Sequence, residues 1–227
     1  LGSSGSFTTA LINGIFHLNL SKLTSDELAE RACEIEIDIL KEPIGKQDQY
    51  IAAWGGIREF TFHNDGKVTN KVMYENEDDY IDLKNNLLLI YTGKTRKASS
   101  ILSEQKDKSE NNDELMLKNL DKVKSMGLEF ASLLASKDFK SYGKLMHEHW
   151  LLKKERSTAM TNLRIDELYN FGITNGSNGG KVIGAGGGGF ILFQTDNMNM
   201  LRRKFIENNI RVIDFNFVNS GTEIINV

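Results

Sequence analysis

The chain has 227 residues, of which 40% are hydrophobic and 26% charged, and its formal net charge is −3. This length allows one or two domains, and the absence of a basic stripe argues against a nucleic-acid-binding protein. The single cysteine, Cys33, excludes a disulfide framework and favours a reducing compartment, so we expect the cytoplasm. No apolar run reaches membrane-spanning length and no signal peptide is visible, so we expect no membrane partner.

A glycine- and serine-rich segment at residues 1–6 runs directly into an apolar helical pattern that extends to Leu18. N–H groups at a helix start, together with the helix dipole and close backbone approach at glycine, favour anion binding. A serine hydroxyl in such a loop can also ligate Mg²⁺ held by nucleotide phosphates. An ordinary N-cap serine produces the same pattern, so the segment alone leaves both interpretations open.

The next helix carries an acidic residue on its apolar face. Thr24 and Glu27 form a capping box, which predicts a helix that continues to about Leu40. At 100° per residue, Glu36 falls in the middle of the arc formed by Leu28, Ala29, Ala32, Cys33, Ile35, Ile39 and Leu40. An inward carboxylate must be paired, protonated or bound to a cation. A metal ligand and a buried salt bridge are therefore both open.

A Pro-x-Gly turn at residues 43–45 precedes a second candidate carboxylate, Asp48, which lies between Gln47 and Gln49. Aspartate can orient or deprotonate a substrate hydroxyl. It also caps helices commonly, and a helix is predicted to begin near Gln49. Both roles are compatible, because a charged aspartate is favourable at a helix start.

Residues 57–73 predict a hairpin with a turn at 64–66, and the acidic residues 75–82 indicate a solvated connection. The apolar run 87–91 indicates a buried strand. It leads to Thr92, Gly93 and a basic segment that includes Arg96. Cations after a buried strand suit an anionic ligand, although a surface loop has the same composition. Residues 104–114 lack apolar periodicity and indicate a mobile loop.

Helices are predicted at about 114–135, 139–153, 157–171 and 197–208, and a strand at 210–217. His147 and His149 point in different directions on a helix, which is poor geometry for zinc. Between the third and fourth helices, two short apolar strands flank a loop that contains Gly184, Gly186, Gly187 and Gly188. A glycine run between strands indicates a close approach to the backbone.

Three features in this order resemble the GHMP small-molecule kinases: a Leu-Gly-Ser-Ser loop opening a helix, a Pro-x-Gly-x-x-Asp turn, and a Gly-Ala-Gly-Gly-Gly-Gly connection. The resemblance covers essentially the whole chain. Within that family, residues 34–40, residues 43–49 and Tyr91-Thr92-Gly93 look most like the D-glycero-D-manno-heptose 7-phosphate kinases. Those enzymes transfer phosphate from ATP to the anomeric hydroxyl of a phosphorylated heptose.

The resemblance implies an α+β, two-domain GHMP kinase fold. Residues 1–84 would form the remainder of a truncated N-terminal domain, and residues 85–227 a ferredoxin-like C-terminal domain. ATP and Mg²⁺ are the implied cofactors, a nucleotide and a small sugar phosphate the implied partners, and a homodimer is compatible with the resemblance. The rival interpretations are a fucose- or galactose-type sugar 1-kinase and an inactive sugar- or nucleotide-binding relative. The intact Glu36 and Asp48 argue against the inactive relative.

The resemblance also implies roles for individual residues. Asp48 matches the catalytic aspartate, and the nucleotide-phosphate loop matches Gly2, Ser3, Ser4, Gly5 and Ser6. The implied metal ligands are Ser3, Ser4 and Glu36. The third-motif loop matches Gly184, Gly186, Gly187 and Gly188. The expected substrate-binding residues are Lys46, Gln47, Gln49, Thr92, Gly93 and Arg96.

Two departures from the family pattern stand out. Gly5 occupies a position where relatives often carry serine or alanine, which we expect to be harmless to a backbone cradle. The chain also starts without methionine inside the phosphate-loop motif. We therefore expect a fragment, and we expect the residues before Leu1 to carry part of the active site.

Overall fold

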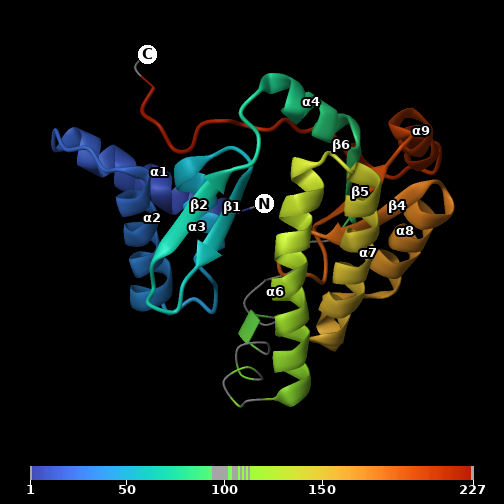
Figure 1. Ribbon diagram of the computed structural model, residues 1–227, viewed down its shortest axis with the longest axis horizontal. Coiled ribbons are helices and arrows are strands. Elements are labelled where there is room, and N and C mark those ends of the chain that lie inside the picture. The colour runs from blue at the N-terminus through green and yellow to red at the C-terminus, as the bar shows by residue number, and fades with distance from the viewer. Residues whose placement is uncertain are drawn as a thin grey trace. The chain divides into compact units, whose positions relative to one another are not determined.

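The computed structural model describes residues 2–93, 102, 103, 107, 109, 111 and 113–225. The chain forms two compact units, Leu1–Glu75 with Phe217–Val227, and Asn76–Asn216 (Figure 1). In this division residues 76–84 belong to the second unit, and the C-terminal segment returns to the first unit. There the amide of Gly56 donates to the carbonyl of Val218 at 2.8 Å, and Thr222 donates to Ala52 at 2.9 Å. Within the described residues, no helix is both long and apolar enough to cross a lipid bilayer.

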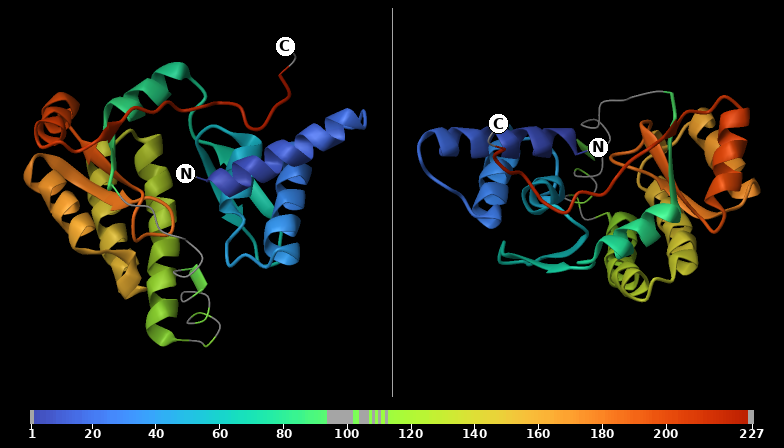
Figure 2. Two further views of the ribbon diagram at one scale, coloured as in Figure 1. Left: turned by 180° about the vertical axis from the view of Figure 1, so that it is seen from behind. Right: turned by 90° about the horizontal axis from the view of Figure 1, so that it is seen from above.

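The first unit packs its helices on one apolar core, with a hairpin beside them. Its elements are α1 (Ser3–Leu18), α2 (Ser25–Cys33), the π-helix η1 (Glu34–Ile39), α3 (Gln47–Trp54), β1 (Arg58–Phe62) and β2 (Val68–Val72). The capping box is confirmed, since Thr24 Oγ1 accepts from the Glu27 amide and the Glu27 carboxylate accepts from the Thr24 amide. Figure 2 shows α1, α2 and α3 side by side, and they share a core of Ile12, Leu28, Ala29, Ala32, Cys33, Tyr50 and Ala53.

The end of the second helix differs from the predicted regular α-helix, because it widens into the π-helix η1. The amide of Leu40 donates to the carbonyl of Ile35, five residues earlier, at 2.9 Å. The advance of 100° per residue therefore fails there, and Ile39 and Leu40, predicted to be buried, are 66% and 61% exposed. Glu36 is buried as predicted, with 3% exposure. π-turns often occur at functional sites.

The second unit confirms the predicted ferredoxin-like layer. Its strands lie in the order β4-β5-β3-β6 and every pairing is antiparallel. Strand, helices, two strands, helix and strand in this order define the ferredoxin-like arrangement. Its elements are α4 (Glu77–Asn85), β3 (Leu87–Tyr91), α6 (Glu114–Ala135), α7 (Phe139–Glu155), η2 (Thr158–Met160), α8 (Leu163–Thr174), β4 (Ser177–Val182), β5 (Phe190–Thr195), α9 (Met198–Glu207) and β6 (Val212–Ile213).

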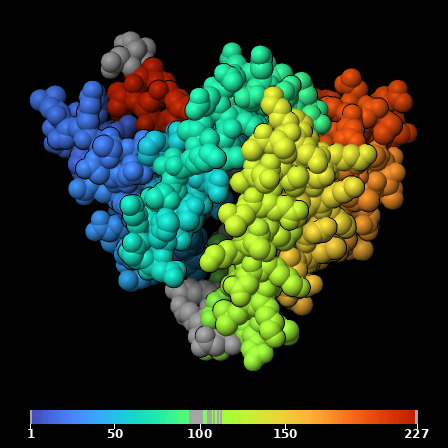
Figure 3. Space-filling view, in the orientation of Figure 1, coloured from blue at the N-terminus to red at the C-terminus, as the bar shows by residue number. Residues whose placement is uncertain are grey.

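Several elements of this unit differ from the sequence pattern. Residues 75–82, predicted to be a connection, contribute to helix α4 because Tyr80 and Leu83 are buried. The predicted helix 157–171 is interrupted, because Asn162 caps a new helix by accepting from the amide of Ile165. The strand predicted at 210–217 pairs over two residues only. Helix α6 lies on the surface (Figure 3), and Leu115 in its first turn is 79% exposed.

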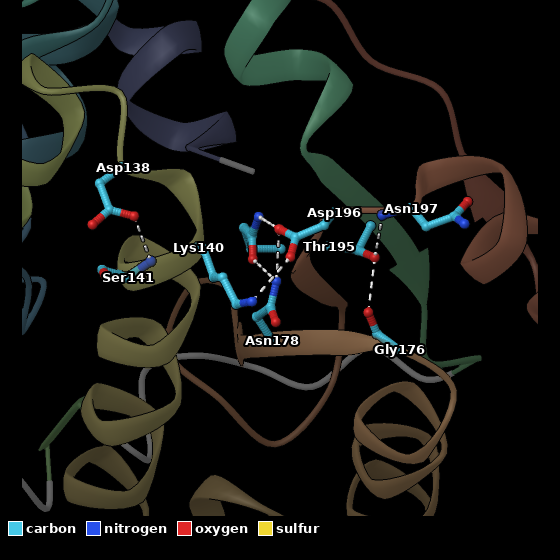
Figure 4. Close-up of polar contacts among 9 residues, drawn as sticks. Asp138, Lys140, Ser141, Gly176, Asn178, Thr195, Asp196 and Asn197 are labelled. Carbon is cyan, nitrogen blue, oxygen red and sulfur yellow. Dashed lines mark hydrogen bonds and ion pairs between the residues drawn. The ribbon is translucent and has the colours of Figure 1, made fainter.

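Helix α7 packs directly on the edge strand β4 through two glycines. A Cβ atom at Gly179 would lie 1.9 Å from the carbonyl oxygen of Gly143, and one at Gly143 would lie 2.4 Å from Gln194 Oε1. A polar network closes the same end of the sheet (Figure 4): Asn178 Nδ2 donates to Gln194 Oε1 and to Asp196 Oδ1, each at 2.9 Å. This close approach fixes the position of the rest of α7 along the sheet edge.

Candidate active site

In the first unit, the predicted phosphate loop and the predicted catalytic aspartate lie together. Gly5 is buried at the start of α1, where a Cβ atom would lie 2.9 Å from the carbonyl carbon of Asp48 and 3.1 Å from the amide nitrogen of Gln49. A Cβ at Gly2 would lie 3.9 Å from Asp48 Oδ2. The bare backbone of Gly5 therefore lets the first turn of α1 lie on the first turn of α3. Two helix N-termini meet beside an exposed carboxylate.

The start of α1 is suited to an anion. Gly2 precedes the helix with φ 58°, no side chain caps the helix, and its first turn holds no acidic residue. Ser3, Ser4 and Ser6 are exposed. The N–H groups of this turn and the positive end of the helix dipole thus face solvent together with hydroxyl groups, which is the arrangement that binds phosphate.

Glu36 lies beneath this junction. Its Oε1 accepts from Thr8 Oγ1 at 3.0 Å, and its Oε2 accepts from Gln49 Nε2. Thr8 is one turn after Ser4 on the same face of α1, so the carboxylate lies near the serine-bearing end of the helix. No cation among the described residues is within ion-pair distance of Glu36, so the salt bridge left open by the sequence is not observed there. The carboxylate has neutral donors only, and its charge is uncompensated by this part of the chain.

The amides and the lysine around Asp48 have distinct environments. Gln47 is exposed beside Asp48, whereas Gln49 is buried and its Oε1 has no hydrogen-bond partner. Lys46 Nζ donates to both carboxylate oxygens of Glu30 at 2.9 Å, and Tyr50 also donates to Glu30. Burial opposes ionisation of Glu30, but these two donors lower its pKa overall. In this structure the ammonium group of Lys46 therefore pairs with Glu30.

In the second unit, the third-motif loop joins β4 to β5. Gly184, Gly186 and Gly187 have φ values of 79°, 103° and 73°, which side chains rarely adopt. The loop rests on η2: the Gly187 amide donates to Met160 O at 2.8 Å, and a Cβ at Gly186 would lie 2.6 Å from Met160 Sδ. The close backbone approach predicted from the glycine run is thus made by the chain's own η2 segment.

Two of the predicted substrate residues flank this loop. Thr92 is buried, and its Oγ1 and amide both donate to the carbonyl of Gly189, at 3.0 and 2.9 Å. Gly93 is exposed with φ 85°. Thr92 therefore holds the loop in place. Arg96 and its basic neighbours lie outside the described residues.

Two family profiles match this chain. The family profile described as "GHMP kinases N terminal domain" matches residues 1–56, and that described as "GHMP kinases C terminal" matches residues 130–208. The chain belongs to the GHMP kinases. This family uses ATP as phosphate donor.

Several relatives of this GHMP kinase carry names that refer to sugars. The chain is 30% identical to D-glycero-alpha-D-manno-heptose 7-phosphate kinase of Campylobacter jejuni, over 98% of this chain and 66% of that protein. It is 25% identical to the bifunctional fucokinase/GDP-fucose pyrophosphorylase of Arabidopsis thaliana, over 85% of this chain and 18% of that protein. A solved structure of a putative sugar kinase from C. jejuni superposes with a TM-score of 0.73 at 26% identity, covering 97% and 63%. The chain spans less than two thirds of these relatives' lengths.

Sequence reasoning missed a group of basic side chains in this GHMP kinase. His149 and Lys153 lie on one face of α7 at positions i and i+4, Arg156 follows at i+7 as the C-cap of the helix, and Lys181 lies on β4, the strand that α7 contacts. Burial, reinforced by the neighbouring cations, lowers the pKa of Lys153 to about 7 and that of Lys181 to about 8. Burial also lowers the pKa of His149, to about 3. The i, i+4, i+7 spacing was the available sequence signal.

Other features of the structure are less suited to binding a phosphate group or a metal ion. A hollow of about 590 Å³ along α2 is lined by Glu27, Glu30, Glu34 and Asp38 against Arg31 and Lys46, so its charge disfavours a phosphate. His147 bonds to the hydroxyl of Tyr169 at 2.7 Å and stacks on that ring, which is a structural role. Among the described residues, no cluster of three His, Cys, Asp or Glu side chains could hold a metal ion.

Proposed function

We propose that the whole protein transfers the γ-phosphate of ATP to the anomeric hydroxyl of a sugar phosphate, D-glycero-D-manno-heptose 7-phosphate before any other. The similarity to the C. jejuni heptose 7-phosphate kinase over 98% of this chain supports the acceptor. The observation that carries the reaction class is the contact of Gly5 with the backbone of Asp48, since it puts a carboxylate at a helix N-terminus suited to phosphate.

The roles follow from what phosphoryl transfer requires. The transition state is loose, so positioning and charge neutralisation dominate over covalent chemistry. The N–H groups at the start of α1 would hold nucleotide phosphates through residues Gly2, Ser3, Ser4, Gly5 and Ser6. Asp48, exposed at the same junction, would orient the acceptor hydroxyl or take its proton. Gln47, exposed next to Asp48, would contact the acceptor.

The oxygen donors at this junction fit Mg²⁺. A buried carboxylate that accepts from neutral donors, one of which is Thr8 on the helix that begins with Ser3 and Ser4, forms with those serine hydroxyls a hard-oxygen set that suits this ion. Ser3 or Ser4 and Glu36 would hold it, and when bound it would neutralise charge on the phosphates. Gln49 and Thr8 fix the carboxylate from below, so we assign Gln49 a positioning role.

The structure supports the remaining predicted substrate-binding residues to different degrees. Thr92 would act through the loop that it holds, and Gly93 would lie at its surface. Lys46 would have to leave Glu30 to reach an acceptor. Arg96 stays a prediction. The third-motif residues Gly184, Gly186, Gly187 and Gly188 would shape the site. We place the protein in the cytoplasm with a nucleotide and a sugar phosphate as partners, and light scattering would test a homodimer.

A coupled assay on the full-length protein tests the proposal, with ATP, Mg²⁺ and a sugar panel. We expect ADP release that depends on D-glycero-D-manno-heptose 7-phosphate, and a new anomeric phosphate in the ³¹P spectrum. ADP release with fucose or galactose but not with the heptose phosphate would instead establish the fucose- or galactose-type kinase, which the fucokinase relative favours. Sugar binding without turnover under any condition would identify an inactive relative.

A further inference from the structure

The cations of α7 and β4 converge where β4 ends and the glycine loop begins. Lys153 Nζ donates to the carbonyl of Gly184 and, at 3.4 Å, to that of Val182, so its ammonium group lies at the exit of the strand. Lys181 is the preceding residue of β4, and its charge acts on both Lys153 and His149. Both lysines retain partial exposure, so a ligand can reach them from solvent.

This cluster has no compensating carboxylate in the part of the chain that the structure describes. No ion pair involves Lys153 or Lys181 there, and the charges that act on Lys153 are those of Lys181 and Arg156. Two acidic side chains of the same unit have other partners: Glu155 accepts from Asn119 at 3.2 Å, and Asp166 accepts from Thr161 at 2.9 Å and pairs with Lys154 at 3.9 Å. Half-buried like charges destabilise a fold, and an anion neutralises them.

The backbone of the adjoining loop also presents groups that suit an anion. The chain's own donors occupy the carbonyls of Val182, Gly184, Gly187 and Gly189. By contrast, the N–H groups of Gly184, Ala185, Gly186, Gly188 and Gly189 donate to no acceptor among the described residues. Free amides in a turn with left-handed glycines form a concavity that favours anions. The loop thus presents donors beside two ammonium groups.

We propose that Lys153, Lys181 and the amides of the 184–189 loop bind a phosphate group of a substrate. The identification of that ligand as a substrate rests on the proposed kinase function, whereas the binding of phosphate does not. Two sources share this chemistry: the phosphate that the acceptor already carries, and a phosphate of the nucleotide. Arg156, which donates to Asn119 Oδ1 at 2.8 Å, adds positive potential.

Calorimetry on the full-length protein tests this site without turnover, with inorganic phosphate, ATP, the heptose 7-phosphate and the same sugar lacking phosphate as probes. The variants are Lys153→Met and Lys181→Met, and Lys144→Met on the exposed side of α7 is the matched control. We expect each of the first two to raise the Kd of one phosphate-bearing substrate, and that of inorganic phosphate, by about tenfold or more, since a charge-assisted bond is lost. Lys144→Met and the unphosphorylated sugar should show no such change.

The pattern of losses identifies the source. A loss confined to the heptose phosphate assigns the site to the acceptor, and a loss confined to ATP assigns it to the nucleotide. Unchanged Kd values in both variants would overturn the proposal. So would a loss in Lys153→Met alone, because Lys153 also holds the loop by hydrogen bonds whereas Lys181 does not. Phosphate binding without turnover on any sugar would leave this site standing and the kinase function refuted.

Discussion

Replacing Glu36 with glutamine keeps the shape of a buried side chain and removes its charge. In the structure its carboxylate accepts from Thr8 Oγ1 and Gln49 Nε2, and Gln49 Oε1 is buried without a hydrogen-bond partner. After Glu36→Gln, Thr8 keeps an acceptor, and rotation of the Gln49 amide by half a turn lets the new amide donate to Gln49 Oε1. The exchange therefore replaces charged hydrogen bonds with neutral ones.

The expected change in the free energy of unfolding follows from these two hydrogen bonds. Hydrogen bonds to charged groups contribute about 1.5–3 kcal/mol and neutral ones about 0.5–1.5 kcal/mol, so from the midpoints of these ranges the two bonds together lose roughly 2.5 kcal/mol. Relief of the buried charge offsets part of that loss. A broken buried ion pair would instead cost about 3–5 kcal/mol, which we do not expect because no described cation pairs with Glu36.

The assay combines urea unfolding of the full-length protein with ATP titrations in the presence and absence of Mg²⁺. We expect Glu36→Gln to change the free energy of unfolding by less than about 2 kcal/mol and to weaken ATP binding only when Mg²⁺ is present. Thr8→Val is the control, because it removes one hydrogen bond and keeps the charge, so the Mg²⁺-dependent affinity should persist. A large loss of stability with intact Mg²⁺–ATP affinity would refute the metal-ligand role.

Three further changes test other features. Asp48→Asn should lower turnover by about 10²-fold or more with little change in ATP affinity, and near-normal turnover would remove Asp48 from the mechanism. Gly5→Ala should cost roughly 1–3 kcal/mol of stability and lower kcat, because its Cβ would lie 2.9 Å from the Asp48 backbone; an unchanged kcat would contradict the inferred contact. Lys153 has a folded-state pKa of about 7, below its ordinary 10.5, under burial and the charges of Lys181 and Arg156. The unfolded chain therefore binds more protons between these values, so the unliganded protein should gain stability from pH 7 to 10. Lys153→Met should remove much of that gain, and an identical pH profile would count against the buried charge.

Local signals in the sequence predicted much of this fold. The capping box at Thr24 and the glycine loops specify their conformations through neighbouring residues, so both were predictable. An advance of 100° per residue correctly predicted that Glu36 is buried, but it was wrong for Ile39. No local sequence signal indicates the π-helix that contains both residues. The convergence of Lys153 with Lys181 depends on the contact between α7 and β4, a packing event between distant segments that periodicity does not encode.

The return of the C-terminal segment to the first unit has a consequence for biosynthesis. Thr222 bonds both to Ala52 O and, at 2.9 Å, to the hydroxyl of Thr9, and a Cβ at Gly55 would lie 2.2 Å from the backbone of Ser220. Helices α1 and α3 therefore receive their last contacts from residues that emerge from the ribosome after the entire second unit. The phosphate-loop unit is completed only after the second unit has been translated, so until then the surfaces that contact the C-terminal segment stay uncovered.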